Sequence, residues 1–558
     1  MFNSLSLSTA ALAALLPLFV NAQIARVSPA YNYEFQFPLP IMPVKVPTTS
    51  YTNATTGVTI DFYEVTMQAI TKNLFPDLGD ANLVGYDGQV PGPTFRIPKG
   101  RETVVRFVNQ FNRSASVHLH GSYTFDGWAE DIIQPQQYKD YYYPNSQTAR
   151  TLWYHDHAVG ITAINTYAGL AGMYILDDAA QDEALDLPRG DYDIPLLLHS
   201  RRYTASGDIT DESSELISVY GDTFSVNGQI LPHLVVEPRK YRFRVLNAAA
   251  SRTFNITLQA AESQTNKKFH VIGSDAGLMS NPVETESLVT AMAERWEVVI
   301  DFSDVAGQNV TMFHADCFVD TAYIGSDKIM QFRVGTTVSS QVGNGPLPAT
   351  LVSLDLPTDH VTIDQTFAFG RTNGQWTING QTFSDAANRI LRNVPRGTTE
   401  KWQLTGGNGW SHPVHIHLVD FKIVSRAKTN QNLTTGRNGV TPYEAAALKD
   451  VAVLGNNEVV TVLAKYAPWD GVYMFHCHNT IHEDHDMMAA FNVTALPDFG
   501  YPETTKFEDP MEARFRAVAY TGSSLDEVQQ KLQFFSSLSA YYDVVGIEEA
   551  LDNYHGDN

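Results

Sequence analysis

Ten of the 17 histidines lie in four short groups, and one group also contains a cysteine. The groups are His118-Leu-His120, His155-Asp-His157, His412-Pro-Val-His415-Ile-His417, and His476-Cys477-His478 followed by His482. Residues i and i+2 of a β-strand point to the same face, so each His-x-His pair in a strand directs two imidazoles to one side. Four such pairs supply eight imidazoles, which is enough to bind three metal ions between the regions that carry them.

Cys477 lies between two of these histidines, so its side chain must point to the opposite face of the strand. There it could bind a separate metal together with His412, His482 and Met487. Two imidazoles, a thiolate and a weak thioether are the ligands of a blue-copper site. Structural zinc prefers four closed ligands rich in thiolate, whereas copper heads the affinity order for nitrogen ligands. The sequence therefore predicts copper at both sites, connected by one strand.

The elements that position these residues are predicted to be short β-strands. Runs rich in β-branched and aromatic residues, bounded by Gly, Pro and Asn, occur for example at 103–108, 240–245, 296–300 and 459–463. A turn, a connection, a second turn and a strand recur three times, beginning at Asp87-Gly88-Gln89, Asn227-Gly228-Gln229 and Asn379-Gly380-Gln381. Three ordered copies predict three related β-sandwich domains.

This repeat divides the chain into segments with different expected functions. Residues 1–22 are predicted to be a signal peptide, 23–180 a first domain with two histidine groups, 190–338 a second domain without metal, and 358–558 a third domain with the other two groups. The linkers are an acidic stretch, 177–192, and a stretch rich in Gly, Ser, Thr and Pro, 334–357. Near the C-terminus, Ser524-Leu-Asp-Glu527 is a capping box that predicts a short amphipathic helix used for packing.

The composition indicates where the protein acts and with what. An apolar run ending in Val20-Asn21-Ala22 is typical of a cleaved signal peptide, so we expect a secreted, extracellular protein. Six sequons are compatible with glycosylation: Asn53, Asn112, Asn255, Asn309, Asn432 and Asn492. The net charge of −23 makes nucleic acid and anionic membranes poor partners. We expect a monomer.

Only two cysteines occur, and in a secreted chain they could form a disulfide. The predicted metal site at Cys477 argues against that pairing. Cys317 is then expected to be a buried small hydrophobic residue.

At these motifs the chain resembles the multicopper oxidases, and within them the fungal bilirubin oxidases more than ordinary laccases. The resemblance extends from about residue 83 to about residue 509 and is carried by residues 125–131, 151–157, 409–418 and 476–488. It implies an all-β fold of three consecutive cupredoxin-like Greek-key β-sandwich domains and four copper ions. The implied ligands are His412, Cys477, His482 and Met487 for type 1 copper, His118 and His415 for type 2, and His120, His155, His157, His417, His476 and His478 for the type 3 pair.

Two acids and two further residues are candidates for moving protons and binding the electron donor. Asp126 and Glu483 could relay protons to dioxygen, as similar acids do in the family; alternatively they only hydrogen-bond the backbone or the metal-bound imidazoles. Trp410 could form an aromatic platform near a type 1 histidine, or simply pack. Arg371 could bind a donor carboxylate, of which bilirubin has two, or form a surface ion pair.

The expected function is a secreted oxidase that takes single electrons from bilirubin-like tetrapyrroles, phenols or aromatic amines and reduces dioxygen to water. A laccase that couples phenols or forms pigments remains an alternative, because outer-sphere electron transfer demands little substrate specificity. A metallo-oxidase should need acidic or Met-rich sites, and the 12 methionines cluster only at Met487-Met488. A non-enzymatic electron carrier or copper store would need no second set of eight imidazoles.

Overall fold

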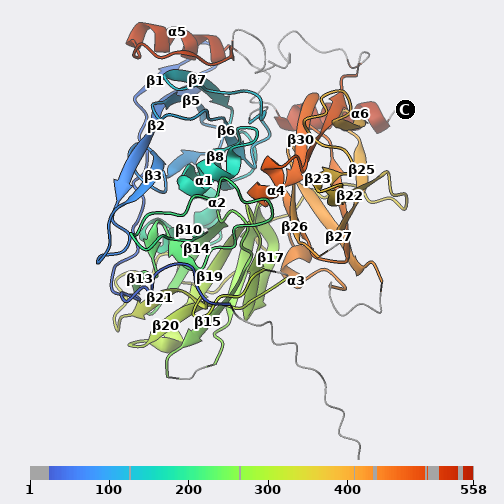
Figure 1. The fold of residues 1–558 in the computed structure, drawn as a ribbon. Coiled ribbons are helices and arrows are strands. Elements are labelled where there is room, and N and C mark those ends of the chain that lie inside the picture. The colour runs from blue at the N-terminus through green and yellow to red at the C-terminus, as the bar shows by residue number, and fades with distance from the viewer. Residues whose placement is uncertain are drawn as a thin grey trace, which may run out of the picture.

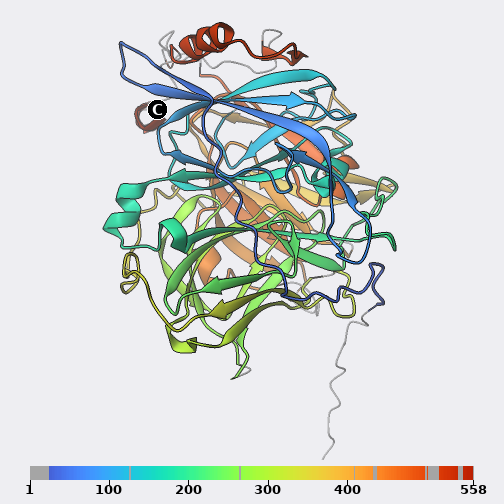
Figure 2. The same ribbon diagram turned by 90° about the vertical axis from the view of Figure 1, so that its left-hand side faces the viewer.

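The computed structural model describes residues 24–124, 127–262, 265–318, 320–406, 409–430, 437–496, 499, 515–537 and 544–556. The predicted signal peptide, 1–22, lies outside these residues. Strands dominate and the helices are short, which confirms the predicted all-β class. Within the described residues the strands pair into six sheets, two in each of three successive units of the chain. The first unit is blue to cyan, the second green to yellow and the third orange, and all three pack against one another (Figures 1 and 2).

The first unit carries the first two histidine groups in its smaller sheet. Its strands are β1 (Thr49–Thr52), β2 (Thr59–Lys72), β3 (Ala81–Tyr86), β4 (Phe95–Pro98), β5 (Glu102–Asn109), β6 (Val117–His120), β7 (Gln137–Tyr143), β8 (Arg150–Asp156) and β9 (Ala171–Asp177), and its helices are α1 (Thr162–Ala168) and α2 (Ala179–Ala184). One sheet has the order β1-β2-β5-β7, with β3 paired to β2, and the other has the order β4-β9-β8-β6.

The second unit contains none of the predicted metal ligands. Its strands are β10 (Asp193–Arg201), β11 (Thr223–Val226), β12 (Gln229–Ile230), β13 (His233–Val236), β14 (Lys240–Asn247), β15 (Phe254–Ala260), β16 (Phe269–Ser274), β17 (Gly277–Thr285), β18 (Ser287–Thr290), β19 (Arg295–Asp301), β20 (Asn309–His314) and β21 (Lys328–Val334), with short 3-10 helices η1 (Gly190–Tyr192) and η2 (Ser303–Val305). The sheet orders are β12-β11-β10-β14-β19-β16-β17 and β13-β21-β20-β15-β18.

The third unit carries the other two histidine groups. Its strands are β22 (Gln365–Thr372), β23 (Gln375–Ile378), β24 (Ile390–Pro395), β25 (Thr399–Gly406), β26 (His412–Ile416), β27 (Phe421–Lys428), β28 (Val451–Leu454), β29 (Glu458–Lys465), β30 (Gly471–Cys477) and β31 (Met488–Thr494), with helices α3 (Pro442–Ala445) and α4 (Thr480–Asp484). The sheet orders are β23-β22-β25-β29-β27 and β24-β31-β30-β26-β28.

The three predicted turns share one backbone conformation. Both central residues of each turn have a left-handed φ: 52° and 74° at Asp87-Gly88, 50° and 77° at Asn227-Gly228, and 53° and 77° at Asn379-Gly380. This is the combination that a two-residue hairpin turn requires and that Asn-Gly and Asp-Gly favour. The strand pairs β2–β5, β10–β14 and β22–β25 are parallel in all three units. The sequence repeat therefore corresponds to a repeat of the fold.

The predicted C-terminal helix is α5 (Leu525–Phe535), and the Ser524 side chain caps it by accepting a hydrogen bond from the backbone N–H of Glu527. Its buried residues Val528 and Leu532 pack against Ile60 and Phe62 of the first unit, although the sequence division placed it in the third. The preceding strand β32 (Val518–Ala519) pairs with β7. A further helix, α6 (Val544–Gly556), which the sequence reading did not predict, packs on the third unit (Figure 1). Among the described residues, every helix is too short or too polar to span a bilayer.

Candidate metal centre

Cys477 ends strand β30, and its side chain lies in the core of the third unit. Its Sγ is 3.5 Å from Nδ1 of His412 and 3.5 Å from Nδ1 of His482, and these two nitrogens are 3.3 Å apart. All three side chains are fully buried. The thiolate and the two imidazoles predicted for a separate site thus converge on one point, as a metal site requires.

Burial sets the protonation of this first donor set. It lowers the pKa of His412 to about 3, and it holds the pKa of His482 well below its ordinary value. Both imidazoles are therefore neutral at neutral pH, the form that binds a metal. Burial raises the pKa of the Cys477 thiol, so a metal must displace its proton to form the thiolate. Met487 is buried in the same core, and its carbonyl oxygen accepts a hydrogen bond of 3.1 Å from the Cys477 N–H.

The other eight histidines converge where the first and third units meet. His118 lies opposite His155 across β6 and β8, and His415 lies opposite His476 across β26 and β30. Ligand atoms approach one another closely in three groups: His118, His415 and His417; His118, His120 and His155; and His157, His417 and His476. The His478 ring completes the wall, with its centroid 5.1 Å from that of His120 and 5.2 Å from that of His155. Every one of these side chains is buried.

Hydrogen bonds orient several of these rings toward the pocket. Nδ1 of His155 lies 2.8 Å from the carbonyl oxygen of Asp156, and Nδ1 of His415 lies 2.9 Å from that of Asp450. Nε2 of both rings is buried and has no hydrogen-bond partner among the described residues. A neutral imidazole that donates through Nδ1 presents its Nε2 lone pair, which is what a metal ligand needs. The donor set therefore fits several metal ions.

Glu483, one of the two predicted acids, is buried beside two of these histidines. Its Oε2 is 3.3 Å from Nδ1 of His476, and its Oε1 is 3.7 Å from Nδ1 of His157. It lies in helix α4, next to His482 of the first donor set, so α4 contributes to both sites. Asp126, the other predicted acid, lies outside the described residues.

Trp410 and Arg371 both lie near the first donor set. Trp410 is half-buried, and its ring centroid is 5.0 Å from that of Trp376. The Arg371 guanidinium lies 5.0 Å from the Trp376 ring centroid and 6.0 Å from that of Trp410. Sequence reasoning missed Trp376, whose ring stacks on His482 at 3.7 Å. Its position in the Asn-Gly-Gln-Trp hairpin, five residues after Arg371, was the available signal.

Sequence reasoning also missed Asp450. Its Oδ1 lies 3.3 Å from Nε2 of His120, and Arg295 donates to both of its carboxylate oxygens. Burial raises the pKa of Asp450, while the Arg295 charge lowers it, and the first effect is larger. The only signal in the sequence was a charged pair, Lys449-Asp450, directly before the apolar strand β28.

Two adjoining cavities lead from the surface of the protein toward three of the histidines. The larger one, of about 440 Å³, is lined by Tyr123, Arg150 and Asp420 among others. A narrow space of about 10 Å³ shares Tyr123 and Asp420 with it and reaches His118, His415 and His417. The Tyr123 hydroxyl donates to Asp420 at 2.6 Å where the two spaces meet.

The two cysteines are both free, so the disulfide alternative is excluded. Cys317 is half-buried rather than fully buried as expected, and its Sγ–H lies 3.7 Å from the carbonyl oxygen of Thr253. Cys317 is separate from the histidine groups.

Comparison with known proteins gives consistent matches over all three units. Three family models described as multicopper oxidase match residues 69–181, 202–342 and 355–496. A bilirubin oxidase from Albifimbria verrucaria is 51% identical over 92% of this chain and 90% of that protein. A laccase from Bacillus subtilis is 32% identical over 78% of this chain and 94% of that protein. The crystal structure of a multi-copper oxidase from Pediococcus acidilactici matches with a TM-score of 0.71 and 25% identity, covering 86% of this chain and 94% of that one.

Proposed function

Because this chain belongs to the multicopper oxidase family, we propose that it takes single electrons from a small organic reductant at a type 1 copper and delivers them to dioxygen at a trinuclear copper cluster. Membership itself establishes an oxidoreductase with dioxygen as acceptor, four coppers of types 1, 2 and 3, and three cupredoxin-like units. The ligands of each copper and the identity of the donor are the proposal.

The observation that carries the proposal is the placement of the two donor sets on opposite faces of β30. We assign type 1 copper to His412, Cys477, His482 and Met487, type 2 to His118 and His415, and the type 3 pair to His120, His155, His157, His417, His476 and His478. The orphaned Nε2 atoms of His155 and His415, and the group formed by His157, His417 and His476, support this assignment.

Bound copper would supply the one-electron chemistry at both sites, so that four electrons and four protons convert one dioxygen to two waters. The chain supplies the electron route, because Cys477 of the first set is bonded through the backbone to His476 and His478 of the second. A few covalent bonds thus separate the two sets. The narrow space that reaches His118 and His415 gives water and dioxygen a way toward the second set from the 440 Å³ cavity.

The donor is proposed to be an aromatic molecule of the bilirubin-like, phenol or aromatic-amine class. Trp410 offers a half-buried indole, and Trp376 connects it by ring contacts to His482. Arg371 lies over both indoles and could bind a donor carboxylate while the donor stacks.

Protons for dioxygen are proposed to pass through Glu483, and Asp126 keeps the same predicted role. The Glu483 carboxylate touches one ligand from the first unit, His157, and one from the third, His476. Glu483→Gln keeps the shape but cannot carry a proton as a carboxylate does. We expect slower oxygen reduction with an unchanged blue absorption band; unchanged turnover would remove Glu483 from this role. Asp126→Asn is tested in the same way.

The two cysteines provide a matched pair of variants for the main proposal. Cys477→Ser should abolish the blue absorption and turnover with every organic donor while the other three coppers stay bound. Cys317→Ser should retain four coppers, the blue absorption and the consumption of one dioxygen per four donor electrons. Blue absorption or donor turnover that survives in Cys477→Ser would contradict the proposed electron route.

Arg371 distinguishes a bilirubin oxidase from a laccase. If the donor is an anionic tetrapyrrole, Arg371→Gln should lower kcat/KM for bilirubin by about tenfold, the value of one lost charge-assisted contact, and leave an uncharged phenol unaffected. If Arg371→Gln changes kcat/KM equally for bilirubin and for the phenol, or if the wild-type protein has a higher kcat/KM for phenols, the laccase function would be favoured instead.

We also propose that the protein is secreted as a monomer after removal of residues 1–22. The support is the predicted cleavage site after Ala22. N-terminal sequencing of protein from the culture medium would test the cleavage, and sedimentation velocity would test the monomer. A retained Met1, or a sedimenting species of twice the chain mass, would contradict these expectations.

A further inference from the structure

Asp450 lies where all three units meet, and its carboxylate and carbonyl contact two different candidate copper ligands. The carbonyl oxygen is 2.9 Å from Nδ1 of His415 in the third unit, and the carboxylate Oδ1 is 3.3 Å from Nε2 of His120 in the first. Arg295, the first residue of β19 in the second unit, donates to Oδ1 at 2.6 Å and to Oδ2 at 2.5 Å. Asp450 thus links the copper-free second unit to both halves of the histidine pocket.

His120 differs from His155 and His415 in which of its ring nitrogens makes a hydrogen bond. His155 and His415 are held through Nδ1 and leave Nε2 without a partner. His120 is held through Nε2, and its Nδ1 is the buried nitrogen without a partner among the described residues. An ionised carboxylate can only accept, so Asp450 selects the tautomer with the proton on Nε2 and leaves the Nδ1 lone pair for a metal.

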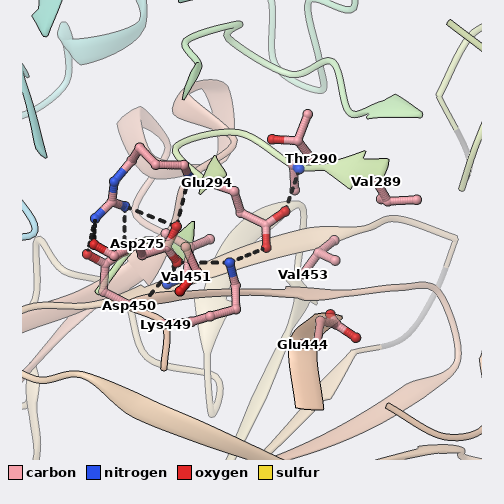
Figure 3. Close-up of polar contacts among 12 residues, drawn as sticks. Asp275, Val289, Thr290, Glu294, Glu444, Lys449, Asp450, Val451 and Val453 are labelled. Atoms are coloured by element: carbon pink, nitrogen blue, oxygen red, sulfur yellow. Dashed lines mark hydrogen bonds and ion pairs between the residues drawn. The ribbon is translucent and has the colours of Figure 1, made fainter. Parts of the chain in front are cut away.

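The carboxylate is itself fixed by a buried network of charges. The Nζ of Lys449 lies 3.0 Å from Asp275 and 3.0 Å from Glu294, both in the second unit. Asp275 also accepts the backbone N–H groups of Asp450 and Val451, at 3.1 and 3.2 Å. Figure 3 shows Asp275, Glu294, Lys449 and Asp450 converging in this network. The network thus joins three buried acids, Asp275, Glu294 and Asp450, to two buried cations, Lys449 and Arg295.

Gly121, the residue after His120, lies close against the Arg295–Asp450 pair. Gly121 has a φ of 90°, and a Cβ atom there would lie 2.5 Å from Nη2 of Arg295 and 3.0 Å from Oδ2 of Asp450. The positive φ favours glycine, and any side chain here would have to displace the Arg295–Asp450 pair.

We propose that Asp450 is a positioning residue of the trinuclear cluster: it holds Nε2–H of His120 so that Nδ1 faces the metal, and Arg295 of the second unit holds Asp450. The second unit then has a purpose in catalysis although it binds no copper. This inference rests on the proposed copper enzyme. A carboxylate that orients a metal-bound imidazole changes metal affinity typically by about 10- to 100-fold when removed.

The test compares two buried carboxylates that are each held by an arginine. Asp450→Ala removes the contact with His120, and Asp450→Asn keeps the volume but has only one acceptor oxygen for three N–H donors, two from Arg295 and one from His120. Glu444→Gln is the matched control, because Glu444 accepts from Arg426 at 2.6 Å and is as buried as Asp450. Figure 3 shows Glu444 apart from the network of Asp275, Glu294, Lys449 and Asp450. Readouts are copper per chain after dialysis against a chelator series, the EPR spectrum, and the blue absorption.

We expect both Asp450 variants to lose cluster copper at about 10- to 100-fold lower chelator concentration than wild type, with new EPR intensity from an uncoupled type 3 copper and an unchanged blue band. Glu444→Gln should match wild type in all three readouts. The proposal is overturned if Asp450→Asn keeps wild-type copper retention and EPR, or if Glu444→Gln loses copper equally. If Asp450→Ala does not fold, Asp450→Asn decides. Wild type that binds fewer than four coppers would instead refute the proposed function.

Discussion

Glu102 is a buried carboxyl group at the start of β5, and its ionisation should destabilise the first unit as the pH rises. The side chain is 3% exposed. Burial raises its pKa from 4.5 to about 7, although a hydrogen bond with Tyr142 lowers it. The folded state therefore holds the proton more tightly than the unfolded state does. The stability from this group is fully present below pH 4.5 and is lost as the pH rises through about 7.

The size of the effect follows from the two pKa values. A difference of about 2.5 between them corresponds to roughly 3.4 kcal/mol once the group is ionised in both states. Between pH 5 and pH 8 the linkage relation gives a loss of about 2.5 kcal/mol. Glu102→Gln cannot ionise, so its stability relative to wild type should increase by that amount over this interval. In a domain of this size the gain corresponds to roughly 5–10 °C in Tm.

Differential scanning calorimetry at pH 5 and pH 8 measures this difference directly. Other titrating groups are common to both proteins, so they cancel when the variant is compared with wild type at each pH. Glu183→Gln, at an exposed position of α2, is the matched control and should show the same Tm difference at both pH values. A Glu102→Gln difference that is also independent of pH would refute the reasoning.

Four further predictions concern the turns, α5, the indole at His482, and copper. Gly380→Ala, where no atom lies within 4 Å of the new Cβ, should cost about 1 kcal/mol in urea unfolding, whereas Gly228→Ala, with the Val90 carbonyl at 2.3 Å, should cost clearly more; equal costs would contradict this. Leu532→Ala should cost about 2–5 kcal/mol and admit protease at 515–537, and resistance equal to wild type would argue against packing. Trp376→Leu should lower kcat/KM for aromatic donors at unchanged blue absorption; an unchanged kcat/KM would exclude an electronic role. Removal of copper should lower Tm, and an equal Tm for the copper-free protein would contradict preferential binding to the folded state.

The parts of the fold that the sequence predicts depend on local rules. Asp87-Gly88 and its two counterparts predict hairpin turns because few residues tolerate two successive left-handed φ angles, and all three turns occur. Ser524 and Glu527 predict the start of α5 because a cap acts within one turn. Which unit α5 packs on depends on distant residues, Ile60 and Phe62 of the first unit, and no local rule predicts that contact.

The candidate site also contains residues that a local rule predicts and residues that it does not. Alternation along one strand places Cys477 opposite to His476 and His478, and the structure brings Cys477 to His412 and His482. Asp450 could not be found by such a rule, because Arg295 and His120 are 155 and 330 residues away in the chain. A contact over that separation depends on how the units pack.

Helix α5 follows every candidate copper ligand in the chain, yet it covers Ile60 and Phe62, which precede all of those ligands. During most of translation this apolar patch on the first sheet faces water. The apolar patch of the first unit is therefore covered only after the candidate copper ligands of the third unit have been synthesised. A product terminated before residue 525 would contain every candidate copper ligand but would keep this apolar patch exposed, which promotes aggregation.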